Sequence, residues 1–284
     1  MSEKLYKTIE INNVKDMLNK TKNIYGEKPA YKIKQEDGKY KIITHKQVRE
    51  MVDALGTALI DLGLKNKRIA IIGENRYEWE IAYLSIVCGT GIVVPLDKAL
   101  PENELEALIE RSEIEAIFYS KKYEDILTKI KYNENNKLKH LISMDNTKNT
   151  DGIYSQVELI NKGEKLLENG NRSFIDAKIN NKEMSIMLFT SGTTSKSKAV
   201  MLSQKNIASN VYAMQRVEDI RSTDSNLAFL PMHHIFGSTC LIMMLSCGVR
   251  NSFPDGLRYV SQNLKEYEVS VFVIHILIHL GRNF

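Results

Sequence analysis

The residues best suited to chemistry lie in one hydroxyl-rich run that follows an apolar segment. The run reads, in order, Thr190, Ser191, Gly192, Thr193, Thr194, Ser195, Lys196, Ser197 and Lys198. Gly192 lets the backbone approach a bound group closely, because it carries no Cβ atom. Successive backbone N–H groups in a turn form an anion-binding nest, and a nearby lysine adds a positive charge. The run therefore suits a polyphosphate, although composition alone favours a solvated Ser/Thr loop between two strands.

The order of the residues excludes two common nucleotide-binding motifs. A Walker loop requires GxxxxGK(S/T), and no glycine stands directly before Lys198. A GxGxxG fingerprint is missing as well, since Gly89 and Gly91 lack the third glycine. A phosphate site at Lys198 must therefore use a different arrangement.

A second candidate group is the segment LPMHHIFG, residues 230–237, which contains the adjacent residues His233 and His234. Taken alone, such a pair is more often a hydrogen-bonded pair in a loop than a site. His275 and His279 are four residues apart, as metal ligands on a helix can be. The sequence offers no third ligand beside them, so no metal site is predicted.

Two strands and a helix are expected to position the hydroxyl-rich run. Residues 185–189 form an apolar strand directly before it, and residues 199–202 form a short strand after it. Ser203 is placed to cap the helix that follows, because its hydroxyl can accept a hydrogen bond from the first turn. The run is therefore the connection between two strands.

Strands and helices alternate along the preceding part of the chain. Apolar runs at residues 68–72, 92–95, 116–119 and 138–144 predict strands, and helices are expected at residues 74–87 and 101–111. This order is typical of βαβ units. The predicted fold class is α/β, with mainly parallel sheets and flanking helices.

The N-terminal segment is expected to form a helix, a hairpin and a second helix. The first helix ends near Tyr25, and the hairpin strands are residues 30–34 and 39–44, with an Asp-Gly turn between them. Thr44 begins a capping box for the second helix, which Gly63 ends.

Composition and charge exclude several classes of protein. Of the 284 residues, 43% are hydrophobic and 26% charged, which is typical of a soluble globular protein and not of a disordered chain. The 39 Lys and Arg are interleaved with 35 Asp and Glu, so no nucleic-acid partner is expected. The apolar stretches at residues 240–249 and 269–280 are shorter than the roughly 20 residues that cross a bilayer. We therefore expect a cytoplasmic protein with no transmembrane segment, in which Cys88, Cys240 and Cys247 are reduced core thiols.

The hydroxyl-rich run resembles the (Y/F)TSGTTGxPKG signature of the adenylate-forming superfamily, which includes acyl-CoA synthetases, firefly luciferase and the adenylation domains of peptide synthetases. Residues 189–194 match the signature without a gap, as does Lys198. The chain has Ser195, Ser197 and Ala199 where the signature has glycine, proline and glycine.

Two further segments agree with the superfamily in order and spacing. Residues 230–237 resemble the next motif, near the acid-binding pocket, with His234 at the motif's histidine and His233 at the aromatic position before it. Residues 73–97 and the segment after them resemble bacterial long-chain fatty acid–CoA ligases more than peptide-synthetase domains. The resemblance extends from about residue 5 to residue 273.

The resemblance implies an AMP-forming acid–CoA ligase that uses ATP, Mg²⁺ and coenzyme A. The carboxylate, expected to come from a long-chain fatty acid, attacks ATP to give acyl-AMP, and the CoA thiol then displaces AMP. The residues implied to bind the phosphates of ATP are Thr190, Ser191, Gly192, Thr193, Thr194 and Lys198. Those implied to border the acyl pocket are His233, His234, Phe236 and Gly237. No nucleophile or general base is expected, because the reaction requires the alignment of two anions and the neutralisation of their charge.

The resemblance covers one domain of the superfamily. Residues 1–284 are expected to be an incomplete large N-terminal domain of an acyl-CoA synthetase-like fold, without the small C-terminal domain. The YGxTE-like and TGD motifs do not occur in the sequence, so we expect the isolated chain to have little or no ligase activity. Two alternatives stay open, namely a ligase that loads an acyl carrier protein and a non-catalytic remnant that binds nucleotide.

Overall fold

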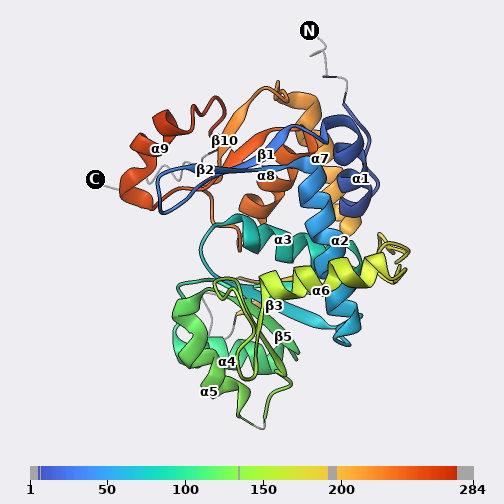
Figure 1. Cartoon of the computed structure of the whole chain (residues 1–284), viewed down its shortest axis with the longest axis vertical. Helices are drawn as coiled ribbons and strands as arrows, with labels where there is room; N and C mark the ends of the chain where they lie inside the picture. Colours follow the sequence, from blue (N-terminus) through green and yellow to red (C-terminus); the bar gives the residue numbers. More distant parts are fainter. Residues whose placement is uncertain (1–5, 7, 134, 191–196, 274–284) are drawn as a thin grey trace, which may run out of the picture.

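Two β-sheets, with a layer of helices between them, form the framework of the described part of the molecule (Figure 1). The computed structural model describes Tyr6 and residues 8–133, 135–190 and 197–273. The smaller sheet lies in the upper part of Figure 1 and the larger sheet in the lower part. The two parts therefore share the helical layer between them.

The larger sheet has seven strands in the order β7-β6-β5-β3-β4-β8-β9. Neighbouring strands are parallel except β8 and β9, which form an antiparallel hairpin. The strands are β3 (Arg68–Ile72), β4 (Ile92–Pro95), β5 (Ala116–Tyr119), β6 (His140–Ser143), β7 (Ile153–Ser155), β8 (Met184–Thr190) and β9 (Lys198–Ser203). The prediction of an α/β fold with a mainly parallel sheet is confirmed.

The apolar composition of these strands follows from their coverage on both faces. In β3, Ile69 and Ile71 belong to the core between the two sheets, whereas Ala70 and Ile72 pack on the outer face. That outer face is covered by α4 (Glu102–Arg111) and α5 (Glu124–Lys131). A parallel strand that is buried on both faces therefore appears in the sequence as a nearly continuous hydrophobic run.

The smaller sheet has the strand order β10-β11-β1-β2. Its strands are β1 (Pro29–Lys34), β2 (Tyr40–Thr44), β10 (Ser225–Leu227) and β11 (Arg250–Ser252). β1 and β2 form the predicted hairpin, and Gly38 in its turn has a φ of 80°, which glycine adopts readily. The parallel pairing of β1 with β11 joins the N-terminal segment to a distant part of the chain.

The helical layer between the sheets contains α2 (His45–Asp61), α3 (Tyr77–Ser85) and α6 (Gln156–Glu168) (Figure 1). Thr44 and Gln47 form the predicted capping box at the start of α2, in which each side chain accepts a hydrogen bond from the other residue's backbone N–H. α6 packs closely on α2, because a Cβ atom on Gly163 would lie 1.8 Å from the carbonyl oxygen of Ala54. Small residues thus hold the middle layer together.

The remaining helices border the smaller sheet (Figure 1). They are α1 (Val14–Tyr25), α7 (Gln204–Val217), α8 (Ile235–Ser246) and α9 (Val260–Glu266). Ser203 caps α7 as predicted, since its side chain accepts a hydrogen bond from the backbone N–H of Asn206. In the part of the chain that the structure describes, every helix is too short or too polar to cross a membrane.

The helix predicted at residues 74–87 is wrong at both ends. α3 begins only at Tyr77, because Asn75 lies in a loop where its side chain bonds to a distant segment. From Ile86 to Thr90 the chain continues as a π-helical turn, in which Gly89 has a φ of 150°. Pro101 is extended and precedes α4, so it caps that helix and is not its first residue.

Candidate functional site

The β8–β9 hairpin carries the hydroxyl-rich run at its turn. The last residue pair of the antiparallel ladder before the turn is Thr190 opposite Lys198. The Thr190 hydroxyl lies 3.5 Å from the carbonyl oxygen of Lys198, and both residues are exposed. The structure therefore brings these two predicted phosphate ligands together. The other four, Ser191, Gly192, Thr193 and Thr194, lie outside the described residues.

β8 ends, and β9 begins, at the carboxyl edge of the larger sheet. β8 is parallel to β4 and runs into the turn, so the segments that follow β4 and β8 leave the sheet at the same edge. In open α/β sheets, ligands bind outside the carboxyl ends of the strands. Thr190 and Lys198, which flank the run predicted to bind phosphate, are therefore at the edge of the sheet where a ligand is expected.

His233 is held at this same edge by Asp97, which follows β4. The Nε2 atom of His233 lies 3.4 Å from Oδ1 of Asp97, and the histidine side chain is 19% exposed. Burial lowers the pKa of His233, while the negative charge of Asp97 acts in the opposite direction. Because the net effect is a lower pKa, His233 is mainly neutral at pH 7, with one N–H donor and one acceptor nitrogen; the donor is Nε2, which faces the Asp97 carboxylate.

His234 and Gly237 shape the start of α8. The Nδ1 atom of His234 accepts a hydrogen bond from the backbone N–H of Phe236, with an N···N distance of 3.3 Å, and so caps the helix. A Cβ atom on Gly237 would lie 2.2 Å from the carbonyl oxygen of Pro231. The structure thus gives His234 a capping role and Gly237 a packing role. That both, with half-buried Phe236, border an acyl pocket stays a prediction.

Asn75 fastens the loop that leads to the two histidines. Its Nδ2 atom donates hydrogen bonds to the carbonyl oxygens of Ala228, at 2.8 Å, and Leu230, at 2.7 Å. Its Oδ1 atom accepts from the backbone N–H of Met232 at 3.2 Å. Sequence reasoning placed Asn75 inside a helix and missed this role. The one available signal was its position shortly after an apolar strand.

Arg111, the last residue of α4, contacts both sides of the hairpin next to the turn. Its Nη2 atom donates to the carbonyl oxygen of Ser197 at 2.7 Å and lies 3.3 Å from the Ser197 hydroxyl. The guanidinium carbon lies 5.2 Å from the centre of the Phe189 ring. This contact could not be predicted from the sequence, because a basic residue is common in the last turn of any helix.

A small cavity of about 20 Å³ lies between the segment after β10 and α8. Gly237 lines it, whereas His233, His234 and Phe236 do not. On this measure, about 10–15 Å³ is enough for one water molecule. The cavity is therefore too small for a fatty acyl chain as it stands.

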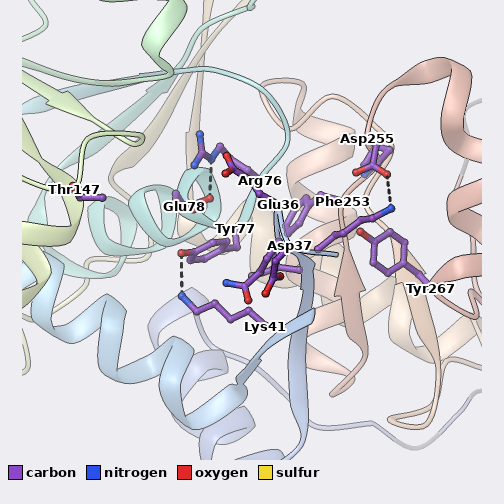
Figure 2. Close-up of a pocket in the computed structure, with 14 residues that line it drawn as sticks. Glu36, Asp37, Lys41, Arg76, Tyr77, Glu78, Thr147, Phe253, Asp255 and Tyr267 are labelled. Carbon is purple, nitrogen blue, oxygen red and sulfur yellow. Dashed lines mark hydrogen bonds and ion pairs between the residues drawn. The ribbon is translucent and has the colours of Figure 1, made fainter. Parts of the chain in front are cut away.

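A much larger cleft, of about 790 Å³, lies between the β1–β2 hairpin, the start of α3 and the segment before α9 (Figure 2). Two of its charged pairs are Arg76 with Glu78, at 2.8 Å, and Lys34 with Asp255, at 3.8 Å. The predicted site residues that the structure describes do not line it. Acidic side chains in its lining are as numerous as basic ones or more so, so the lining does not favour an anionic ligand.

The cysteines do not contribute chemistry to the site. Cys88, Cys240 and Cys247 are free thiols, and burial raises the pKa of Cys88 to about 12 and the pKa of the other two to about 11. Thiols with such high pKa values are poor nucleophiles at neutral pH. Within residues 8–133, 135–190 and 197–273, no group of three His, Cys, Asp or Glu residues could hold a metal ion.

Comparison with known families and proteins gives consistent matches over most of the chain. A family model described as "AMP-binding enzyme" matches residues 18–275. Long-chain-fatty-acid–CoA ligase 1 from Cavia porcellus is 24% identical over 272 residues, which are 87% of this chain and 37% of that protein. A chloroplastic long-chain-fatty-acid–[acyl-carrier-protein] ligase from Arabidopsis thaliana is 25% identical, over 94% of this chain and 39% of that protein. The chain thus spans little more than a third of the length of these relatives.

Solved structures share the fold. A long-chain-fatty-acid–CoA ligase from Archaeoglobus fulgidus superposes with a TM-score of 0.78 at 16% identity, over 94% of this chain and 53% of that one. A luciferase from Phrixothrix hirtus superposes with a TM-score of 0.77 at 17% identity, over 96% of this chain and 53% of that one. The two sheets and the helical layer between them are therefore an arrangement seen in larger proteins.

Proposed function

The chain belongs to the AMP-binding enzyme family, and we propose that it supplies the phosphate-binding part of an enzyme that activates a carboxylic acid with ATP. The observation that carries the proposal is the position of the β8–β9 turn. The signature residues Thr190 and Lys198 lie side by side where β8 ends and β9 begins, at the carboxyl edge of a mainly parallel sheet. A flexible linker of the same composition would not need such a position.

The proposed reaction has two steps, with Mg·ATP as a substrate. A carboxylate oxygen attacks the α-phosphorus of ATP, the bond to the β-phosphate oxygen breaks, and acyl-AMP and pyrophosphate form. The thiol of CoA then attacks the acyl carbon, loses its proton and displaces AMP, which leaves with the electron pair of the broken bond. Both reactants of the first step are anions, so alignment and charge neutralisation are the main catalytic tasks.

The residues of the hairpin turn are proposed to perform these tasks for the phosphates. Thr190, Ser191, Gly192, Thr193 and Thr194 would donate hydroxyl and backbone N–H hydrogen bonds to the β- and γ-phosphates. Lys198 would place a positive charge at the entrance of the turn, where its exposed side chain can reach an anion. Donors fixed before the reaction stabilise the developing charge without reorganisation.

The histidine loop is proposed to border the carboxylate. A neutral His233, whose Nε2 atom faces Asp97, would line the carboxylate pocket without adding a full positive charge, in keeping with its lowered pKa. His234, Phe236 and Gly237 would form the adjoining wall. The names of the relatives support a long-chain fatty acid as the substrate.

An acyl carrier protein is the second candidate for the acceptor. The match to the Arabidopsis thaliana acyl-carrier-protein ligase covers 94% of the chain and supports it. Acid-dependent release of AMP, measured with CoA and with a phosphopantetheinylated carrier protein in parallel, distinguishes the two acceptors. Release that occurs with the carrier protein alone would replace CoA in the proposal.

Binding of Mg·ATP to the 284-residue chain tests the phosphate site. Lys198→Met should weaken binding by about tenfold or more, the range for a charged hydrogen bond. Lys205→Met removes an equally exposed lysine from α7 and should leave the affinity unchanged. Isothermal titration calorimetry gives the affinities, and circular dichroism verifies that both variants are folded. Equal affinities in the two variants would show that the phosphates do not bind at the turn.

A further inference from the structure

Arg111 joins the two strands of the β8–β9 hairpin from outside the hairpin. β9 is the edge strand of the larger sheet and pairs only with β8 among the described strands, so its own ladder gives it support on one side. Arg111 comes from α4 and reaches Ser197 through the two Nη2 contacts. The same guanidinium lies over the Phe189 ring on the other strand. One side chain thus restrains both ends of the turn.

The two contacted residues stand at the limits of the proposed phosphate site. Phe189 precedes Thr190, and Ser197 precedes Lys198. A change in the separation or twist of these two positions would move every donor between them. The planar guanidinium suits this task, because it can stack on a ring and donate in its own plane at the same time.

Ser197 explains why such a restraint is needed in this chain. The superfamily signature has proline at this position, where the ring fixes φ at about −65° and limits the freedom of the unbound loop. Serine lacks this rigidity. Its carbonyl and hydroxyl oxygens are the atoms that Arg111 contacts, so the restraint that the ring would provide can come from a neighbouring helix.

We propose that Arg111 is a positioning residue that holds Phe189 and Ser197, and through them the phosphate-binding turn, in place of the missing proline. The inference rests on the proposed function of the turn. Arg111 itself does not touch the substrate in this proposal. The contact is with the protein, and its effect on ATP passes through the geometry of the hairpin.

Hydrogen–deuterium exchange of the chain without nucleotide tests the restraint separately from any ligand. Arg111→Gln should raise the exchange of amides in residues 188–200 by about tenfold or more, the size expected for the loss of one exposed cation–π contact and one charged hydrogen bond. Arg111→Lys keeps the positive charge but lacks the planar guanidinium that stacks on Phe189 and donates to Ser197. It should therefore raise amide exchange less than Arg111→Gln does. Arg172→Gln, which breaks an exposed pair with Asp176, is the matched control and should leave this segment unchanged.

Rescue by proline separates positioning from a general loss of structure. Ser197→Pro in the Arg111→Gln background should restore slow exchange in residues 188–200 and most of the Mg·ATP affinity. If Arg111→Gln leaves the exchange of this segment unchanged, the positioning role is wrong. If it lowers ATP affinity with no change in exchange and no rescue by proline, Arg111 is a direct ligand, which also overturns the proposal. If only the proposed function is wrong, Lys198→Met will leave ATP binding unchanged, while Arg111→Gln will still raise the exchange of residues 188–200.

Discussion

Replacing Glu80 by glutamine should make the stability of the chain less dependent on pH around neutrality. Glu80 lies on α3 and is 2% exposed. Its Oε2 atom accepts a hydrogen bond from the Tyr31 hydroxyl at 2.6 Å, and within the described residues its Oε1 atom has no hydrogen-bond partner. Burial raises the pKa of Glu80 from 4.5 to about 8, although the hydrogen bond from Tyr31 acts in the opposite direction. The carboxyl group is therefore protonated in the folded chain at pH 7.

The size of the effect follows from the two pKa values. Between pH 4.5 and pH 8 the folded chain binds one more proton at Glu80 than the unfolded chain does, so the free energy of unfolding falls as pH rises. At about 1.36 kcal/mol per pH unit, the loss reaches about 3 kcal/mol at pH 7 and about 5 kcal/mol above pH 8. Glu80→Gln does not titrate and keeps a polar donor of similar shape. The free energy of unfolding of Glu80→Gln, relative to that of the wild type, should therefore rise by about 3 kcal/mol between pH 4.5 and pH 7, and by about 5 kcal/mol above pH 8.

Urea unfolding at pH 5, 6, 7 and 8 provides the measurement. The single tryptophan, Trp79, is buried and stacks on Tyr83 with ring centres 5.5 Å apart, so its fluorescence reports unfolding of α3. Glu50→Gln alters an exposed carboxylate on α2 and should give a profile parallel to the wild type. Taking the difference between Glu80→Gln and wild type cancels the titration of all other groups. If that difference is constant from pH 5 to pH 8, Glu80 ionises inside the fold without penalty, and the argument from burial is refuted.

Three further substitutions test other contacts. Asn75→Leu removes both donors and the acceptor that hold the loop before the histidines, and should lower the free energy of unfolding by about 3 kcal/mol in urea unfolding, because buried carbonyls lose their partners. Gly237→Ala should lower the melting temperature by several degrees, since its Cβ atom would lie 2.2 Å from the carbonyl oxygen of Pro231; an unchanged melting temperature would mean that α8 shifts freely. His45 is buried with its pKa lowered to about 4, so its contribution is present above pH 6.5 and is lost as pH falls towards 4. Relative to His45→Gln, the wild type should lose about 3 kcal/mol over that range, and parallel acid-unfolding curves would contradict it.

Local signals in the sequence predicted the elements that carry the candidate site. The strands at residues 68–72, 92–95 and 116–119 have the predicted bounds, because each is a short apolar run buried on both faces. The capping box at Thr44 and the cap at Ser203 were readable because the partner residues are three positions apart. The hairpin around the hydroxyl-rich run was also predictable from local sequence, because its two strands are adjacent in sequence.

Long-range contacts were not predictable in this way. The parallel pairing of β1 with β11 and the placement of β8 beside β4 depend on which strands meet in three dimensions, and many pairings suit the same apolar runs. The helix predicted at residues 74–87 shows a related failure. Its apolar positions fit a helical period. The helix nevertheless begins only at Tyr77, because the side chain of Asn75 forms hydrogen bonds to a distant loop.

The same distinction separates the chemistry of the site from its geometry. The hydroxyls and the lysine that suit a phosphate are contiguous, so a motif in the sequence reveals them. The side chains that fix their position are not contiguous with them. Three strands, β5, β6 and β7, separate Arg111 from the hairpin in sequence, and Asn75 binds the histidine loop from the segment after β3. The effect of having Ser197 where the superfamily signature has proline therefore cannot be predicted from the motif alone. Its effect depends on whether a residue elsewhere restrains the backbone that proline would have fixed, and in this chain Arg111 is in the position to do so.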